Sequence, residues 1–168
     1  MVSVYRVPIS DISAGGWSPR DNINAPDTDI PLDCWQMLDE TLPFNDNNGT
    51  IIINRSDGVG QAPCRVRLKN PGTPPPGSQA RINVTGTCPD TGFTAFVGLR
   101  LFELAVPRTA KKLHGLSNFG PGIGQFPLTA TEISNITNWS NLELEISLEP
   151  TGGILLTRRV SIAELETF

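Results

Sequence analysis

The residues from Leu142 to Glu149 alternate strictly between apolar and polar side chains, and this pattern constrains the fold more than any other feature of the sequence. Side chains two residues apart share one face of a strand. The four apolar residues of this stretch therefore line one face, and its three glutamates lie on the other. Such a strand covers a core with one face and meets water or a partner with the other, which is typical of antiparallel sheets.

Other short segments have the same character. Val66 and Leu68 alternate with basic residues, and further runs are rich in β-branched or apolar side chains. Between the runs lie turn-forming segments rich in Gly, Pro, Asn and Asp, such as Asn45–Gly49 and Pro150–Gly153. This punctuation predicts a mainly β chain with an antiparallel β-sandwich or jelly-roll fold. The further expected strands are Cys34–Asp39, Thr50–Asn54, Cys64–Lys69, Arg81–Thr85, Thr94–Phe102 and Leu156–Leu165.

One short helix and two segments without strand pattern complete the expected organisation. Thr129, followed three residues later by Glu132, forms a capping-box pattern and predicts about two helical turns. Asp11–Pro31 and Pro107–Pro127 have no strand alternation. Loops of about 20 residues are uncommon in compact domains unless they contact something. We predict an extended N-terminal arm and loop over residues 1–31, a sandwich domain over 32–168, and a contact loop over 107–127.

Composition narrows the class of partners. The 168 residues include 13 basic and 17 acidic side chains, for a net charge of −4, so a basic surface for nucleic acid is not expected. The N-terminus lacks the basic and apolar regions of a signal peptide. The most apolar stretch, Phe93–Val106, is shorter than a membrane span and contains Arg100 and Glu103. We expect a soluble protein made in the host cytoplasm, without nucleic-acid or membrane partners.

Residues suited to catalysis are few. A nucleophilic triad normally needs a histidine, and His114, the single histidine, is expected at the surface or in a loop. Cys34, Cys64 and Cys88 lack zinc-ligand spacing and are expected to be reduced core or strand residues. The aspartates fit no calcium loop, and the glycine-rich segment 120–124 lacks the lysine of a phosphate loop. We predict no catalytic residue, no metal ligand and no cofactor; a pair of carboxylates for glycoside hydrolysis remains a minor alternative.

Both ends of the chain resemble a family of tailed-bacteriophage structural proteins. The residues that carry the resemblance are Val7–Pro19, Met37–Thr41, Leu128–Leu144 and Arg159–Glu166. The resemblance implies a virion protein in which a capped helical turn and an aspartate- or tryptophan-containing hinge lead into the last two strands of a jelly-roll-like sandwich. It also implies a place on the capsid surface as a decoration (cement) protein that binds the major capsid protein. A tail, baseplate or receptor-binding accessory module is the alternative within the same group.

For a decoration protein, the functional site is a contact surface. The arm from Val2 to Pro31 can lie along a neighbour or add a strand to an exposed sheet edge. We also expect self-association, most simply as a homotrimer, while Trp35 and Trp139 are expected to pack in the core. Large apolar groups and lysines of the N-terminal arm and of the contact loop over 107–127 are the predicted interface residues: Val2, Val4, Tyr5, Val7, Trp17, Lys111, Lys112, Phe119, Ile123 and Phe126.

A lectin-like, carbohydrate-binding module is a second alternative. Sandwiches of this type bind sugars with aromatic platforms and Asp or Asn side chains, and Trp17 and Trp139 are the candidate platforms. Fold alone does not choose between these functions, because function resides in sites placed on folds.

Overall fold

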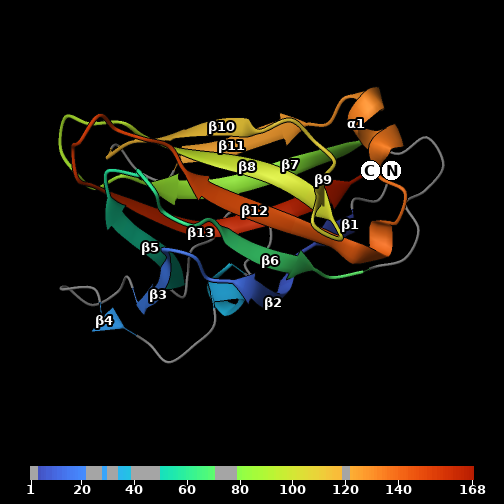
Figure 1. Ribbon diagram of the computed structural model, residues 1–168, viewed down its shortest axis with the longest axis horizontal. Helices are drawn as coiled ribbons and strands as arrows, with labels where there is room; N and C mark the ends of the chain where they lie inside the picture. The colour runs from blue at the N-terminus through green and yellow to red at the C-terminus, as the bar shows by residue number, and fades with distance from the viewer. Residues whose placement is uncertain (1–3, 22–27, 30–33, 39–49, 71–78, 119–121) are drawn as a thin grey trace.

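The computed structural model describes residues 4–21, 28–29, 34–38, 50–70, 79–118 and 122–168, and two antiparallel sheets pack face to face within them (Figure 1). The first sheet has the spatial order β11 (Gly122–Pro127), β7 (Ala80–Thr87), β13 (Leu156–Thr167), β5 (Thr50–Ser56), β3 (Ser18–Asp21) and β4 (Thr28–Asp29), with β1 (Val4–Arg6) also paired to β13. The second has the order β10 (Lys112–Leu116), β8 (Ala95–Glu103), β12 (Leu142–Leu148), β6 (Cys64–Leu68) and β2 (Pro8–Ser13), with β9 (Val106–Pro107) beside β8. The predicted antiparallel β-sandwich is therefore confirmed.

The core lies between the sheets and is built from the predicted alternation. Leu142, Leu144 and Ile146 of β12 are buried against apolar residues of the facing sheet, including Val160 and Leu165 of β13. The three predicted reduced cysteines are free thiols and buried, as expected. Trp35 and Trp139 pack against the core from its margins, also as expected.

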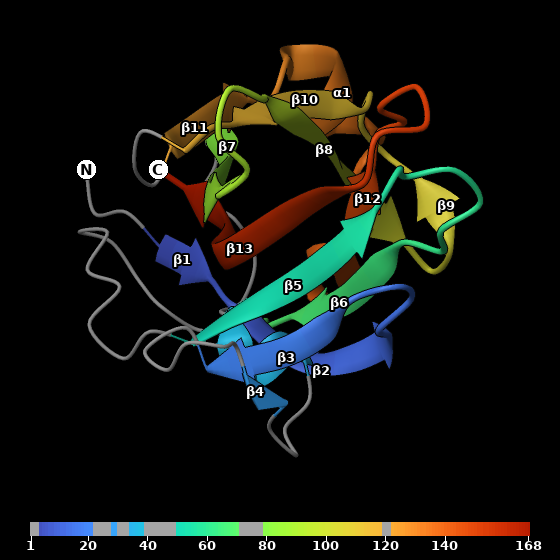
Figure 2. The ribbon, with the colours of Figure 1, turned by 90° about the vertical axis from the view of Figure 1, so that its left-hand side faces the viewer.

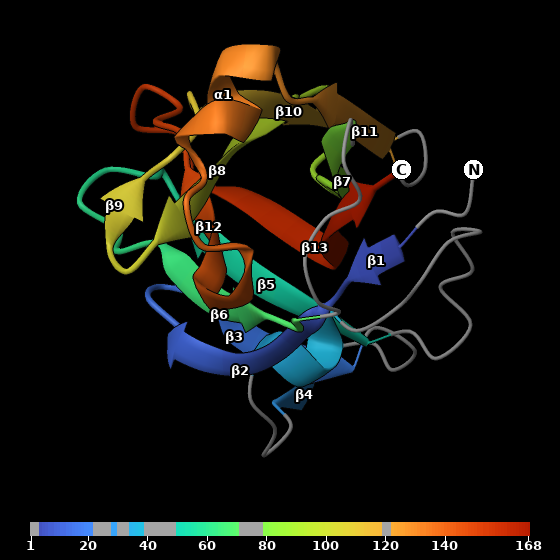
Figure 3. The same cartoon turned by 90° about the vertical axis from the view of Figure 1, so that its right-hand side faces the viewer.

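The short helical elements cover one end of the sandwich and its lower edge. Helix α1 (Ala130–Asn135) and the 3₁₀ turn η2 (Trp139–Asn141) lie at the end shown in Figure 3. The capping box is confirmed: Thr129 accepts a hydrogen bond from the Glu132 amide, and the Glu132 carboxylate accepts one from the Thr129 amide. The expected strand Cys34–Asp39 is wrong, because Cys34–Met37 forms a 3₁₀ turn, η1, whose first amides donate to the Asp11 carboxylate at 2.8–2.9 Å.

The extended N-terminal arm is a wrong prediction for residues 4–21. β1 and β3 are strands of the first sheet, and β2 is the edge strand of the second. Their backbone amides and carbonyls thereby find partners that a free arm would leave to water. These strands pair with strands of the 32–168 segment, so the part of 1–31 that the structure describes is built into the sandwich. Residues 1–3, 22–27 and 30–33 of the predicted arm lie outside the described residues.

The predicted contact loop over 107–127 is also corrected, because most of it forms strands. β10 pairs with β8, and β11 pairs with β7, so the two strands lie at corresponding edges of the two sheets. His114 on β10 is buried and not a surface residue; its Nε2 lies 3.1 Å from the Gly122 carbonyl oxygen. A Cβ at Gly124 would lie 2.6 Å from the His114 ring, so this glycine makes room for the imidazole between the edges.

In the described part of the chain, no helix has the length and apolar character needed to cross a bilayer.

Candidate functional site

Two surface features stand at opposite ends of the sandwich. At one end lie the loops between β5 and β6, β7 and β8, and β12 and β13, which face the viewer in Figure 2. At the other end, a pocket with a mixed polar and apolar lining lies between the β8–β9 hairpin, the segment leading into β10, and helix α1. Both features are candidate binding surfaces, because the side chains of the first are exposed and those of the second line a cavity.

The loop end carries large apolar side chains that are exposed to solvent. We call this set the apolar end; it consists of Val59, Phe93, Phe96, Ile154 and Leu155. Leu155 is 63% exposed and Phe96 is 45% exposed. Leu113 lies on the outer face of the same sheet as Phe96, where β10 pairs with β8. Single exposed apolar residues are ordinary, but several at one end of a domain indicate a contact surface.

Hydrogen bonds tie the three loops of the apolar end together. The Thr151 amide donates to the Asp57 carbonyl oxygen at 2.9 Å, which joins the β12–β13 loop to the β5–β6 loop. The Asp90 carboxylate accepts a hydrogen bond from the Thr157 amide, which joins the β7–β8 loop to the start of β13. Beneath them, the buried Arg158 guanidinium donates to the carbonyl oxygens of Ser56 and Glu149 at 3.0 and 2.8 Å. The loops that carry the exposed apolar residues are therefore held to one another by hydrogen bonds.

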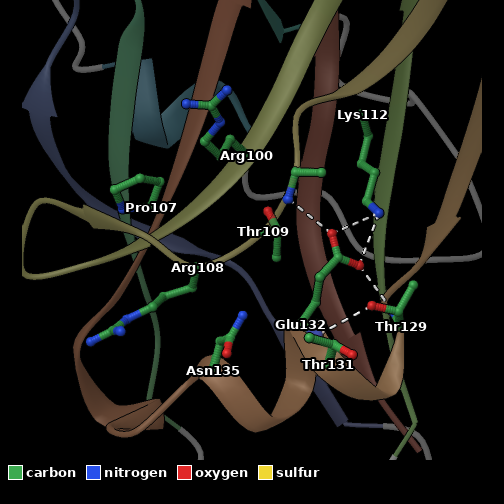
Figure 4. Close-up of a pocket in the computed structure, with 10 residues that line it drawn as sticks. Arg100, Pro107, Arg108, Thr109, Lys112, Thr129, Thr131, Glu132 and Asn135 are labelled. Carbon is green, nitrogen blue, oxygen red and sulfur yellow. Dashed lines mark hydrogen bonds and ion pairs between the residues drawn. The ribbon is translucent and has the colours of Figure 1, made fainter.

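The pocket at the other end has a volume of about 520 Å³ and a mixed polar lining (Figure 4). Arg100 comes from β8, Pro107 from β9, and Thr131, Glu132 and Asn135 from α1. The remaining lining residues come from the segment before β10, from β10 itself and from the helix cap; they are Arg108, Thr109, Ala110, Lys112 and Thr129. Its size falls in the range of about 300–1,000 Å³ typical of small-molecule sites.

Glu132, the acidic residue of the pocket wall, is fully engaged. Its carboxylate accepts hydrogen bonds from the amides of Ala110 and Thr129 and from the Lys112 ammonium, each at 2.9 Å. Burial alone would raise its pKa, but these donors outweigh burial and hold the pKa of Glu132 below its ordinary value. A carboxylate kept ionised in this way is a structural anchor and a poor general acid.

A second carboxylate is held in the same manner just beyond the pocket. Glu103 accepts hydrogen bonds from the amide and hydroxyl of Thr137 at 2.9 and 2.6 Å, and Arg108 Nε lies 3.1 Å from Glu103 Oε2. Burial would raise the pKa of Glu103, yet the hydrogen bonds from Thr137 lower it overall. Arg108 is thereby paired with a carboxylate that is not part of the pocket lining.

One glutamate with a raised pKa, Glu164, lies in neither the apolar end nor the pocket. Glu164 of β13 is fully buried, and burial raises its pKa to about 7. Its Oε1 accepts a hydrogen bond from Asn83 at 3.0 Å, and the same amide reaches Glu166 at 3.1 Å. The two carboxylates are neighbours on one strand, but a glycosidase pair must flank a bound sugar, and Glu164 has no exposed surface at which a substrate would meet it.

The structure separates the predicted interface residues from one another. Lys111 and Ile123 are exposed, while Val4, Tyr5 and Val7 are half-buried around β1. Trp17 is a wrong prediction: its ring is only 3% exposed and packs in the core, where the turn closed by its amide and the Ala14 carbonyl directs it inward. Lys112 pairs with Glu132, Lys111 pairs with Glu149, and Phe126 packs against the core and the His114 ring. Val2 and Phe119 lie outside the described residues.

The residues of the apolar end were missed by the sequence analysis, although a signal is present. Val59 lies between Gly58 and Gly60, Phe93 follows Gly92, and Ile154 follows Gly153. These glycines have positive φ angles and form tight turns, so the adjacent apolar residues cannot be interior strand positions. Large apolar residues inside glycine turns are therefore the pattern that predicts this surface.

No group of three or more His, Cys, Asp or Glu side chains is arranged to hold a metal ion within the described ranges.

Comparison with known proteins shows a shared fold. No family model matches the chain, and no curated protein sequence matches it. Among solved structures, the chain is similar to the Stig cyclase Fisc from Fischerella sp. TAU, with a TM-score of 0.50, 12% identity, and coverage of 98% of this chain and 89% of that one. At this identity, the likeness concerns the fold alone.

Two further structures resemble the chain more loosely. The CBM22-1 xylan-binding domain from Paenibacillus barcinonensis Xyn10C has a TM-score of 0.43 and 8% identity, with 99% of this chain and 92% of that one covered. The K3 cleaved adhesin domain of Lys-gingipain from Porphyromonas gingivalis w83 has a TM-score of 0.46 and 10% identity, with 98% and 99% covered.

Proposed function

We propose that the chain is a non-catalytic interaction module of a tailed-phage virion and that it binds a protein partner through the apolar end. The observation that carries this proposal is the set of exposed apolar side chains on loops that are hydrogen-bonded to one another. The resemblance of both chain ends to phage structural proteins supplies the setting. Within that setting, a capsid decoration protein on the outer shell, bound to the major capsid protein as a homotrimer, is the specific role we propose.

Binding through the apolar end is favoured because a partner removes its exposed apolar side chains from water. Burying an apolar side chain against a partner contributes about 25 cal/mol per Å² of apolar area removed from water. Because the loops already share hydrogen bonds, little conformational entropy is lost when a partner covers them. Repetition over a symmetric shell then adds avidity to individually modest contacts. The engaged carboxylates Glu103 and Glu132 support a non-catalytic role, because neither is free to move a proton.

The test is attachment of purified protein to phage particles from which it has been stripped. Leu155→Ser should reduce bound copies per particle at least tenfold, because Leu155 is exposed in the apolar end. Leu104→Ser is the matched control, since Leu104 is equally exposed, at 63%, but lies in the β8–β9 turn at the other end. An equal decrease in bound copies with both variants, or no decrease with Leu155→Ser, would contradict the proposal.

Copy number separates decoration from a tail role. Quantitative mass spectrometry of intact particles should find hundreds of copies for a shell protein, whereas a tail, baseplate or receptor-binding component would be present in a few to dozens. Light scattering of the purified chain tests the trimer directly. A monomer at all concentrations would contradict self-association through this chain alone.

Carbohydrate binding is the second candidate function, and the pocket beside α1 is the observation that favours it. The pocket and the apolar end lie at opposite ends of the sandwich, so Leu155→Ser should leave sugar binding unchanged. A glycan array with the wild-type chain therefore tests this candidate independently of particle attachment.

A further inference from the structure

We propose that the pocket beside α1 binds the anionic group of an acidic saccharide unit and that Arg100 is its anion-binding residue. This inference rests on the second candidate function and gives its ligand a chemical class. It does not depend on the virion assignment, because none of the apolar end lines the pocket.

Three basic side chains line the pocket, and two of them are paired with carboxylates. The Lys112 ammonium is paired with Glu132 at 2.9 Å. Arg108 is paired with Glu103 at 3.1 Å. Arg100 has neither an ion pair nor a hydrogen bond among the described residues, and its Nε is buried without an acceptor. Among the described residues, the Arg100 guanidinium is therefore the basic group of the pocket lining that is available to bind an anion.

The strand register explains why Arg100 stays unpaired. Its direct cross-strand neighbour on β12 is Glu145. The Glu145 carboxylate instead accepts a hydrogen bond from Arg65 at 2.8 Å, from the opposite side of β12. Arg65 also lies 3.8 Å from Glu143, so it holds both acidic side chains of this strand face. With these carboxylates engaged elsewhere, Arg100 is left for a ligand.

The unengaged side chains that share the pocket with Arg100 are neutral hydrogen-bonding groups. The Thr131 hydroxyl and the Asn135 carboxamide have no hydrogen-bond partner among the described residues, and the Asn135 side chain points toward Thr109 in Figure 4. The Thr109 oxygen accepts a hydrogen bond from the Leu101 amide at 3.0 Å and retains its own O–H for donation. Hydroxyl and carboxamide groups both donate and accept hydrogen bonds, so they match a ligand that carries hydroxyl groups beside its anionic group.

The dimensions favour an anion attached to a larger polar body. A volume of about 520 Å³ exceeds what a single inorganic ion fills. Pro107 and Ala110 add apolar surface against which the C–H face of a sugar ring can pack. A guanidinium binds carboxylate, sulfate and phosphate groups through paired N–H donors, so the chemistry shared by these anions defines the site.

The test is a titration followed by amide chemical shifts in two-dimensional NMR, with glucuronate, glucose 6-phosphate, glucose and inorganic phosphate as separate probes. We expect shifts for the pocket amides with both sugar anions, weaker binding in high salt, and at least tenfold weaker binding of neutral glucose. Comparing the affinities for glucuronate and glucose 6-phosphate shows whether the site prefers a carboxylate or a phosphate. Inorganic phosphate binding as tightly as the sugar anions would overturn the saccharide part, and equal binding of glucose would overturn the anion part.

Three variants assign the anion to Arg100. Arg100→Gln should weaken glucuronate binding about tenfold or more, and Arg100→Lys should restore part of it because the charge is kept and the paired donors are lost. Arg55→Gln is the matched control, since Arg55 is exposed on β5 of the other sheet and should leave affinity unchanged. Unchanged affinity in Arg100→Gln, with a melting temperature like that of the wild type, would overturn the assignment. Particle attachment of the same variant reports separately on the apolar end.

Discussion

The guanidinium of Arg65 lies over the ring of Phe102, with its central carbon 3.9 Å from the ring centroid. The two residues come from β6 and β8, on either side of β12, and Arg65 bridges the glutamates of the strand between them. One arginine thus screens two carboxylates, Glu143 and Glu145, that are 6% and 9% exposed. The two glutamates of β12 therefore share one cation in their ion pairs.

Replacing Arg65 should therefore cost stability. In Arg65→Gln, the buried carboxylates of Glu143 and Glu145 lose the cation that contacts both of them, and we expect a loss of about 2 kcal/mol in the free energy of unfolding. Urea denaturation measures the loss. The double variant Arg65→Gln/Glu145→Gln should recover part of it, because one of the two unpaired charges is gone. Equal stability of wild type and Arg65→Gln would contradict a bridging role.

Burial of Glu164 predicts that part of the stability falls as the pH rises. The pKa of Glu164 is about 7 in the folded chain and ordinary, near 4.5, in the unfolded one, so the folded state holds its proton more tightly. Its contribution is complete below the unfolded value and is lost as the pH rises from about 4.5 through 7. The melting temperature of the wild type should therefore drop by several degrees relative to Glu164→Gln over this window.

The wild type must be compared with Glu164→Gln, because other carboxylates change the stability of the wild type with pH in the opposite direction. Glu103 and Glu132 have lowered pKa values, so their contributions are present above the ordinary range and are lost as the pH falls. Both remain in Glu164→Gln and cancel in the difference. A difference between wild type and variant that does not change with pH would show that Glu164 titrates normally.

The β8–β9 turn stores backbone strain that substitution should release. Leu104 and Ala105 have φ angles of 50° and 67°, in the left-handed region that disfavours side chains with a Cβ. Asn-Gly is the preferred pair for such a turn. We expect Leu104→Asn/Ala105→Gly to gain about 1–2 kcal/mol, measured as a rise of a few degrees in melting temperature.

A control comes from a turn that already has glycine. Gly153 has a φ of 87°, and a Cβ there would contact nothing within 4 Å, so Gly153→Ala changes the backbone preference alone. It should lower the melting temperature. If both changes have the same sign, strain at Leu104 and Ala105 is not the cause.

The capping box predicts a local loss with a conservative rescue. Thr129→Ala removes the oxygen that accepts the Glu132 amide at 3.1 Å and should cost about 1 kcal/mol. Thr129→Ser keeps the oxygen and should stay close to wild type. Chemical denaturation of the three proteins checks the order, and a loss as large in Thr129→Ser would assign the effect to the missing methyl group.

Local patterns in the sequence predicted local structure correctly. The Thr129–Glu132 box depends on residues three apart, and the alternation over Leu142–Glu149 assigns the apolar face of β12 without reference to any other strand. The alternation also predicts that the polar face of β12 meets water or a partner, but its glutamates Glu143 and Glu145 are buried. Glu143 and Glu145 are covered because Arg65 is paired beside them, and a contact between residues 80 positions apart leaves no trace in the local pattern.

The same reasoning explains why the edge strands and the pocket were not found. Glycines in β10 and β11 were interpreted as loop residues, whereas Gly124 is needed for the buried His114 ring on the neighbouring edge. The pocket draws its lining from β8, β9, β10 and α1, whose proximity is a product of the sheet order. Residues at the apolar end are different, because the adjacent glycines mark their turns in the sequence itself.

The final strand of the chain pairs with β1, β5 and β7, which are contributed by the beginning and middle of the polypeptide. During synthesis, these earlier segments emerge from the ribosome long before their common partner exists. The pairings of the first sheet that involve β13 therefore form only after β13 itself has been synthesised. Such distant pairings slow folding, because the long intervening segments must first be brought together.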